Sequence, residues 1–168
     1  GMRHWHPYIK DTLAEMQTQG IERAVGLVMA PHYSHMSIEA YFKKIGEAES
    51  TIEIASINNW HLLPGYLDAL VSRVRATLER FPVEVRSQVP VIFSAHSLPQ
   101  RILEWNDPYP EQLRATVEAV MQKLGDQPHD FAFQSAAISN EPWLGPDVSV
   151  LIKRFAEQGQ KKIISCPI

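Results

Sequence analysis

Short apolar runs alternate with stretches of helical periodicity along nearly the whole chain, and this alternation constrains the fold most strongly. Five short runs, rich in β-branched or aromatic residues, predict strands. They are Arg23 to Ala30, Thr51 to Ile57, Val89 to Ala95, Phe131 to Gln134 and Lys162 to Cys166. Stretches with apolar residues three and four positions apart predict helices between them. They are Tyr8 to Gly20, Ser37 to Ile45, Pro64 to Phe81, Asp107 to Gly125 and Asp147 to Gly159. Such alternation produces parallel sheets with right-handed crossovers, so the predicted fold class is α/β, doubly wound, with flanking helices.

Polar residues stand where three of these helices are predicted to begin. Ser37, Asp107 and Asp147 can each accept a hydrogen bond from a backbone N–H of the first turn. The prolines beside Asp107 fit the first turn of a helix as well. We therefore expect these residues to cap helices, and we interpret Cys166 as a small buried strand residue.

The pattern begins with a helix that no strand precedes and ends with a strand that no helix follows, as a piece of a larger α/β protein would. The segment from Arg80 to Val89 is a candidate boundary between two sheet systems. We therefore expect two domain parts, residues 1–85 and 86–168, and no internal repeat.

Composition excludes several classes of protein. With 168 residues, of which 45% are hydrophobic and 21% charged, the chain can bury a core without disulfides. A net charge of −3 gives no reason to expect nucleic acid or a polybasic membrane contact. No apolar run approaches the ~18 residues of a membrane span, and no secretion signal is present, so we expect a cytoplasmic protein.

Chemically informative residues follow the predicted strands, where open α/β sheets bind ligands. His32, Tyr33, Ser34 and His35 follow the first strand. His96, flanked by two serines, follows the third. Ser135 and Trp143 follow the fourth. These positions predict a pocket around His96, suited to a planar ligand that stacks on an aromatic ring.

Each of these residues also has a purely structural interpretation. A histidine at a strand end is more often a hydrogen-bonded structural residue than a catalyst, and Trp143 can anchor a surface loop. His32 and His35 lack a cysteine or carboxylate at ligand spacing, which weighs against a metal site. The sequence contains no GxGxxG, Walker or GxSxG motif, so nucleotide binding and serine-hydrolase chemistry lose their main support.

Four motifs in order resemble the ferrochelatases, which insert ferrous iron into a porphyrin in haem synthesis and are classed as lyases. They are SAHSLP at 94–99, NDPYPEQLRATVEAV at 106–120, FQS at 133–135 and PWLGPD at 142–147. The segments GMRHWHPYI and LVMAPHYSHMSIEAY also fit the family, so the resemblance covers essentially the whole chain. It implies two similar Rossmann-type chelatase domains, with residues 1–85 from the end of the first and residues 86–168 from the start of the second.

The resemblance also implies roles for individual residues. His96 matches the family's histidine, which accepts pyrrole protons or holds the iron on one face of the macrocycle; an imidazole suits both tasks. Trp143 and Ser135 match residues that line the porphyrin cleft. Arg3 and His4 match a segment near the pocket mouth, where an arginine could pair with a propionate. Tyr33 and Ser34 belong to a matching pocket-facing loop, so these two residues are expected to bind substrate as well.

Departures from the family limit these expectations. Family members carry a strand and porphyrin-contacting loop before the segment that matches Gly1, and an acidic residue that faces the histidine after the segment that matches Ile168. We therefore expect a middle fragment that is inactive alone. An iron–sulfur cluster is not expected, because Cys166 stands alone and the loop from His32 to Ser37 has no cysteine. Ferrous iron enters only as substrate. The oligomeric state and a peripheral membrane contact of the full-length protein stay open.

The porphyrin is expected to be coproporphyrin III in preference to protoporphyrin IX, because APHYSHMSIEAY and the spacing of SAAISNEPWLGPD resemble the monomeric ferrochelatases of Gram-positive bacteria. Two alternatives stay open: a non-catalytic α/β module that binds porphyrin or metal, and a related α/β protein for another ligand.

Overall fold

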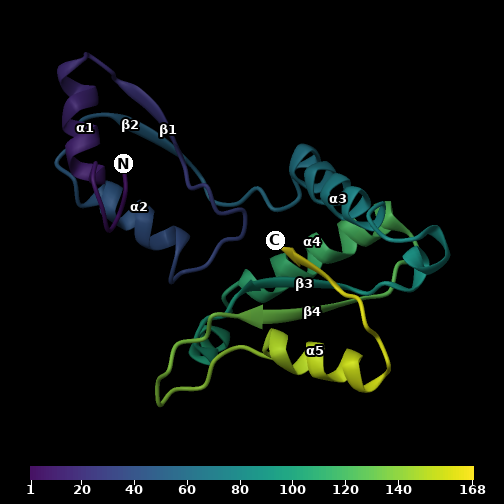
Figure 1. Ribbon diagram of the computed structural model, residues 1–168. Coiled ribbons are helices and arrows are strands. Elements are labelled where there is room, and N and C mark those ends of the chain that lie inside the picture. The colour runs from purple at the N-terminus through teal and green to yellow at the C-terminus, as the bar shows by residue number, and fades with distance from the viewer. The chain divides into compact units, whose positions relative to one another are not determined.

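The computed structural model describes residues 1–168 and contains the predicted alternation of helices and strands (Figure 1). The chain forms two compact units, Gly1–Trp60 and His61–Ile168. The first unit contains α1 (Ile9–Thr18), β1 (Arg23–Leu27), α2 (Ile38–Gly46) and β2 (Glu53–Ile57). The second contains α3 (Pro64–Leu78), the 3-10 helix η1 (Val83–Gln88), β3 (Val91–His96), the 3-10 helix η2 (Gln100–Trp105), α4 (Tyr109–Leu124), β4 (His129–Gln134), α5 (Val148–Glu157) and β5 (Ile164–Pro167).

In the first unit, β1 and β2 form a parallel pair in which Ala24 lies opposite Ile54. These two side chains pack with residues of both α1 and α2, so the two helices cover the same face of the pair. Gly26 lies on that face too, where an added Cβ would stand 3.2 Å from Ile54 Cγ2 and 3.5 Å from the ring of Phe42. The opposite face carries the exposed side chains of Val25 and Leu27.

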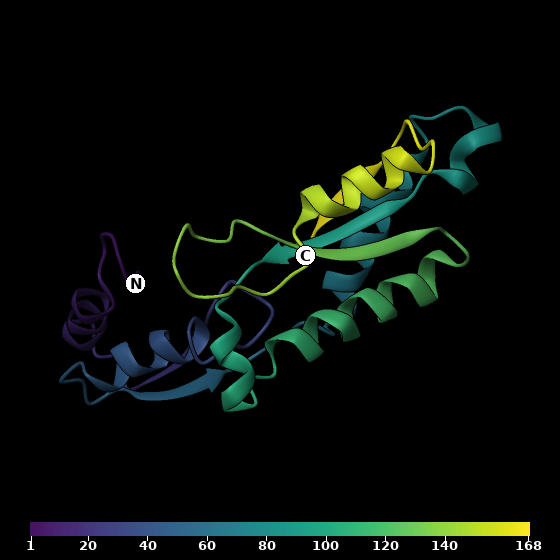
Figure 2. The ribbon, with the colours of Figure 1, turned by 90° about the horizontal axis from the view of Figure 1, so that it is seen from below.

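In the second unit, three parallel strands lie in the order β4-β3-β5. Figure 2 shows α5 on one side of this sheet and α4 on the other. Phe93 of β3 packs toward α3 and α4, while its neighbour Ile92 packs toward α5. This division follows from the two-residue repeat of a strand, because successive side chains point to opposite faces. The first five residues of β3 are therefore buried.

The larger core of the second unit lies between this sheet and helices α3 and α4. Its buried members are Leu67, Leu70, Val71, Val74, Val89, Val91, Phe93, Val117, Val120, Ile164 and Cys166. The smaller core, beneath α5, consists of Ile92, Ala132, Leu151 and Phe155. Helices on both faces of an all-parallel sheet confirm the α/β, doubly wound fold class.

All five predicted strands differ from the observed ones at one or both ends, and at two of them, β1 and β3, a proline lies at the end that differs. β1 stops at Leu27 rather than Ala30, since the Val28 carbonyl accepts the indole N–H of Trp60 at 3.0 Å and the Pro31 carbonyl accepts the Trp60 backbone N–H at 3.0 Å. β3 begins at Val91 rather than Val89, because Pro90 has no N–H to donate to a neighbouring strand. At its other end β3 includes His96.

The predicted domain boundary does not coincide with the division between the compact units. α3 packs on α4 and β5, which places it in the second unit. The segment Arg80 to Val89 contains η1 and is held by side-chain hydrogen bonds. Arg86 donates to the carbonyls of Glu79 and Phe81. Gln127 donates to the carbonyls of Arg86 and Val89. The assignment of residues 1–85 and 86–168 to two chelatase-type domains stays a prediction.

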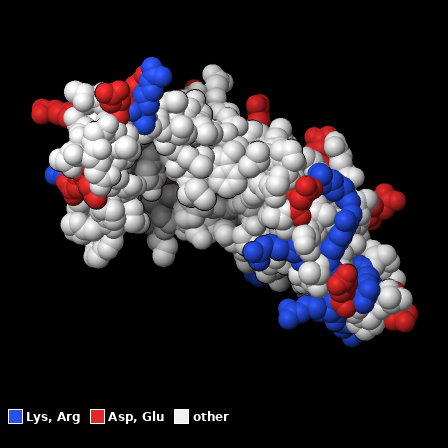
Figure 3. Space-filling model, turned by 90° about the horizontal axis from the view of Figure 1, so that it is seen from above, with Lys and Arg blue, Asp and Glu red and all other residues white.

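The surface is of mixed charge. On the face drawn in Figure 3, red acidic side chains lie among the blue basic ones. One opposite-charge contact joins Lys123 of α4 to Asp68 of α3 at 2.7 Å. No helix combines the length and the apolar character that crossing a bilayer would require.

Candidate functional site

His96 stands at the carboxyl end of the central strand of the second unit. Its side chain is exposed, whereas the five residues before it are buried. Opposite it in the ladder is Gln134, whose carbonyl accepts the backbone N–H of Ser97 at 2.7 Å. The strand thus presents an accessible imidazole on a backbone that is fixed by its neighbour.

Tyr109 holds this strand end from the side of α4. Its hydroxyl donates to the carbonyl oxygen of His96 at 2.9 Å, and its backbone N–H donates to the buried carboxylate of Asp107 at 2.9 Å. Burial, with a smaller contribution from the charge of Asp107, raises the pKa of Tyr109 to about 12. The phenol therefore keeps its proton at neutral pH and remains a donor. The helix begins close to the predicted start, but the predicted cap is displaced by one residue: Pro108 rather than Asp107 occupies the N-cap position, and Asp107 accepts from the Tyr109 N–H.

The loop that carries Trp143 is joined to the loop after His96. Pro99 and Trp143 form an antiparallel bridge. Four hydrogen bonds accompany it: Ser97 Oγ to the Leu144 carbonyl at 2.8 Å, Leu144 N–H to the Leu98 carbonyl at 2.9 Å, Gln100 N–H to the Pro142 carbonyl at 2.9 Å, and Gln100 Nε2 to the Trp143 carbonyl at 3.0 Å. The structure therefore brings together two loops that the sequence separates by more than forty residues.

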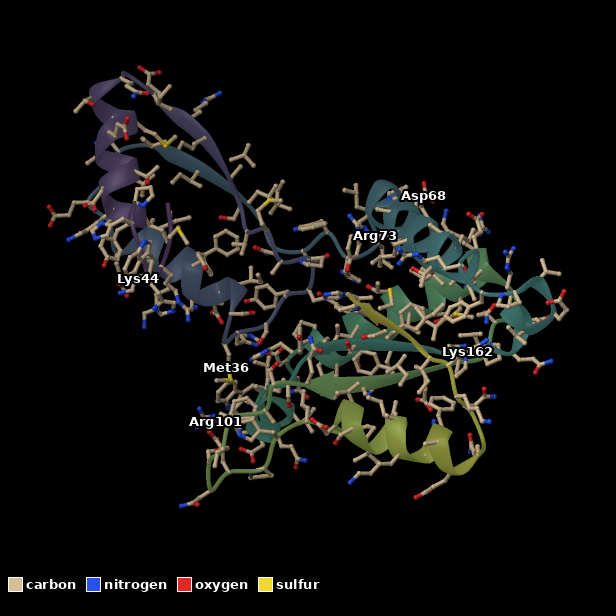
Figure 4. The ribbon with its side chains drawn as sticks, viewed as in Figure 1. Met36, Lys44, Asp68, Arg73, Arg101 and Lys162 are labelled. Atoms are coloured by element: carbon tan, nitrogen blue, oxygen red, sulfur yellow. The ribbon has the colours of Figure 1, made fainter.

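An ion pair and an indole hydrogen bond add to this contact. Arg101, labelled in Figure 4, pairs with Glu141 at 3.2 Å. Trp143 itself is half-buried, and its indole N–H donates to Ser139 Oγ at 2.8 Å. The hydrogen bond fixes the edge of the ring.

Ser135 is exposed and follows β4 directly. Its φ of 62° lies in the left-handed region, which is costly for a residue other than glycine. The chain therefore turns sharply away from the sheet as soon as the strand ends. It returns at Pro146, whose carbonyl accepts the N–H of Phe133 at 2.8 Å.

Arg3 and His4 lie in the first unit and contact each other. Arg3 Nε donates to His4 Nε2 at 2.8 Å, and Arg3 also donates to the carbonyl of Ser37 at 3.3 Å. The guanidinium carbon lies 5.4 Å from the ring centre of Tyr41. Arg3 is therefore oriented by three neighbours, while His4 is exposed.

Tyr33 and Ser34 lie in the loop before α2. The ring of Tyr33 meets His35 edge to face at 5.4 Å. Ser34 is fully buried, and its Oγ accepts the N–H of Met36 at 3.1 Å. The predicted cap at Ser37 is wrong in its chemistry: Ser37 occupies the position before α2, but its hydroxyl makes no capping bond. Instead the Ser34 carbonyl accepts from Ser37 and Glu39.

His32 and His35 are the other candidate ligands in the first unit. His32 is buried, and His35 faces Glu39 at 3.9 Å. No three or more His, Cys, Asp or Glu side chains form a group that could hold a metal ion. Cys166 is buried on β5, as predicted, and burial raises the pKa of its thiol to about 11.

The predicted site residues thus fall into two sets. His96, Ser135 and Trp143 follow strands of the second unit, and Arg3, His4, Tyr33 and Ser34 belong to the first. Sequence reasoning missed Ser97 and Gln100, which bridge two loops, and the hydroxyl of Tyr109, which reaches the His96 carbonyl. The sequence SAHSLPQ at 94–100 could have indicated Ser97 and Gln100, because polar residues on both sides of a proline are typical of a turn whose side chains make hydrogen bonds.

Together the fold and the site define an α/β protein with a histidine at the end of its central strand and an aromatic loop fastened beside that strand end. Comparison with known proteins is in accord with this class. The sequence model of the ferrochelatase family matches residues 1–168. The chain belongs to the ferrochelatase family.

Curated relatives match over the whole chain. A ferrochelatase of Deinococcus radiodurans is 45% identical over 174 residues, which is 100% of this chain and 55% of that protein. A ferrochelatase of Herpetosiphon aurantiacus is 40% identical over 171 residues, 99% of this chain and 56% of that protein. A coproporphyrin III ferrochelatase of Listeria innocua is 37% identical over 172 residues, which is 100% of this chain and 56% of that protein. The chain therefore spans little more than half the length of these relatives.

Proposed function

We propose that the protein inserts ferrous iron into a porphyrin, with His96 as the proton acceptor. The observation that carries this proposal is the exposed imidazole at the end of an otherwise buried strand. Exposure leaves the ring nitrogens accessible to a bound macrocycle, and the hydrogen bond from Tyr109 to the His96 carbonyl keeps the backbone in place.

The reaction releases protons as the iron enters. Each of the two pyrrole N–H groups of the free porphyrin loses its proton, and the four ring nitrogens then bind Fe²⁺ without any change in its oxidation state. A neutral imidazole nitrogen of His96 would accept one proton at a time and return it to water before the next transfer. Fe²⁺ is thus a substrate, and the iron porphyrin leaves as product.

The remaining predicted residues would bind and orient the macrocycle. Trp143 offers a flat ring for stacking, and Ser135 a hydroxyl beside the end of β4. Arg3 offers a guanidinium for a propionate, with His4 beside it. Tyr33 offers an aromatic ring for contact with the macrocycle, and the buried Ser34 would hold that loop in shape through its bond to Met36.

Coproporphyrin III is the substrate that we favour over protoporphyrin IX. It carries propionates where protoporphyrin IX carries vinyl groups, so cationic side chains at the pocket mouth would distinguish the two. Relatives at 36–37% identity, from Listeria innocua and Bacillus subtilis among others, are named coproporphyrin III ferrochelatase.

A second candidate is a module that binds porphyrin or metal without turnover. It is supported by the loop of Trp143, which is joined to the loop after His96 by contacts within these 168 residues. Under this candidate the isolated chain holds porphyrin through Trp143 and His96, but it releases no iron porphyrin.

One experiment separates these candidates. The 168-residue chain and the protein in its full encoded length are each incubated without oxygen with Fe²⁺ and coproporphyrin III, and metallation is followed by absorbance. We expect turnover by the full encoded protein, with slower turnover on protoporphyrin IX, and only porphyrin binding by the 168 residues. Binding without metallation in both samples would favour the module, and binding in neither would rule out both candidates.

A further inference from the structure

Ser97, the residue directly after His96, uses its N–H and its hydroxyl to join other segments. Its side chain is almost completely buried, with 1% of its surface exposed. Its N–H donates to the Gln134 carbonyl at 2.7 Å, and its hydroxyl donates to the Leu144 carbonyl at 2.8 Å. One residue therefore links the end of β3 both to β4 and to the loop that carries Trp143.

The Trp143 backbone is held from both sides by the residues after His96. Before it, the Pro142 carbonyl accepts the Gln100 N–H. After it, Leu144 donates its N–H to Leu98 and accepts from the Ser97 hydroxyl. We call these contacts, together with the bond from Gln100 Nε2 to the Trp143 carbonyl, the loop clamp.

The stretch of the same loop before the clamp is exposed, although Ser139 within it accepts the indole N–H of Trp143. Residues 135–140 are all exposed, and Ile138 extends fully into solvent with a relative exposure of 108%. Trp143 therefore follows an exposed stretch and is fixed where the loop clamp begins. Within the clamp, the Ser97 hydroxyl is buried, whereas Gln100 is exposed. A buried hydrogen bond meets little competition from water, and loss of its donor would leave the Leu144 carbonyl without that partner.

We propose that Ser97 is a positioning residue, which sets the place of the Trp143 ring relative to the His96 imidazole. This inference rests on the proposed function, in which the porphyrin stacks on Trp143 and gives its protons to His96. Proton transfer requires a nitrogen-to-nitrogen separation within hydrogen-bond reach, so a small shift of the stacking ring would misplace the pyrrole N–H groups.

The test is a double-mutant cycle in the full encoded protein with Ser97→Ala and Trp143→Ala. The affinity for metal-free coproporphyrin III is measured by quenching of porphyrin fluorescence. We expect Ser97→Ala to weaken binding about five-fold, the usual equivalent of one net hydrogen bond. In the Trp143→Ala background the same substitution should have almost no effect, because the ring that it positions is gone.

The outcomes separate the inference from the proposed function. If Trp143→Ala weakens binding but Ser97→Ala does not, or if the two losses multiply independently, the positioning role is wrong and the proposed function stands. If Trp143→Ala leaves the affinity unchanged, the porphyrin role of Trp143 falls, and the role of Ser97 falls with it.

Two further variants guard against a trivial loss of folding. Gln100→Ala removes an exposed donor of the loop clamp without opening the core, so it should weaken binding less than Ser97→Ala but with the same dependence on Trp143. Ser165→Ala removes an exposed hydroxyl on β5 and should leave affinity unchanged. The indole N–H signal of Trp143 in nuclear magnetic resonance should broaden or shift in the Ser97 and Gln100 variants and not in the Ser165 variant; an unmoved signal in the first two would overturn the inference.

Discussion

The two sheets of this protein are built from similar apolar strands but are covered differently. β3 is buried over five consecutive residues because helices pack on both of its faces. β1 alternates between exposed and half-buried residues, since α1 and α2 cover only one face. Val25 is 66% exposed although its side chain is as apolar as those of β3. Apolar side chains thus make a strand face suitable for burial, but the face is buried only where a helix packs on it.

The largest difference should appear in the cores. Phe93→Ala removes a ring that is completely buried between β3 and helices α3 and α4, and it should lower the free energy of unfolding by about 3–5 kcal/mol. Val25→Ala, on the open face of β1, should change it by less than about 0.5 kcal/mol. Urea denaturation followed by circular dichroism measures both. Equal losses would show that the open face is covered in solution.

Within β1 alone, the covered and open faces should respond differently to added volume. Gly26→Val places new atoms against Ile54 and Phe42, where an added Cβ already lies within 3.2–3.5 Å of neighbours. We expect a loss of about 1–3 kcal/mol. Val25→Ile, one position earlier, adds a methylene toward the open side and serves as the control. If Gly26→Val is tolerated as well as the control, α2 does not pack closely on this strand.

The start of α5 offers a test that depends on pH. Asp147 accepts from the hydroxyl and the N–H of Ser149, and these bonds lower the pKa of its carboxyl. Its stabilising effect is therefore fully present above the unfolded pKa and is lost as pH falls through the lower folded pKa. Asp147→Ala should lower the free energy of unfolding by about 1 kcal/mol at pH 7. The loss should be smaller at acid pH, below the folded pKa of Asp147. A cost in thermal melting that is independent of pH would exclude this capping role.

The smallest effect is expected on the helical surface of the second unit. Lys123 and Asp68, the latter labelled in Figure 4, form an exposed ion pair between α4 and α3. A double-mutant cycle with Lys123→Ala and Asp68→Ala should give a coupling of about 0.2–1 kcal/mol that shrinks in high salt. A larger coupling that resists salt would mean that the pair is shielded from solvent.

Local pattern was enough to predict the fold class, since period-two and helical spacings are properties of neighbouring residues. Local pattern did not predict the end of β1, because Trp60, distant in sequence, donates to the carbonyls of Val28 and Pro31. It did not predict the start of β3, because Pro90 has no N–H to donate. The two 3-10 helices were not predicted at all, because their short turns leave no clear periodicity.

The candidate site was predictable only in part. The exposure of His96 at a strand end follows from where parallel strands stop, and the motifs indicated Trp143. The loop clamp did not follow from the sequence, since Ser97 and Leu144 are 47 residues apart. The sequence also did not show that the hydroxyl of Ser34 rather than that of Ser37 bonds near the start of α2, since both serines stand close to the helix start and residue type does not distinguish them.

The role of His96 is tested by metallation of coproporphyrin III with a His96→Ala variant of the full encoded protein, with porphyrin affinity measured in parallel. His129→Ala is the matched control, because His129 is an exposed histidine at the opposite end of the same sheet. We expect His96→Ala to abolish iron insertion and largely preserve porphyrin binding, while His129→Ala retains both. Iron insertion at an undiminished rate by the His96 variant would contradict the central claim that this imidazole accepts the pyrrole protons.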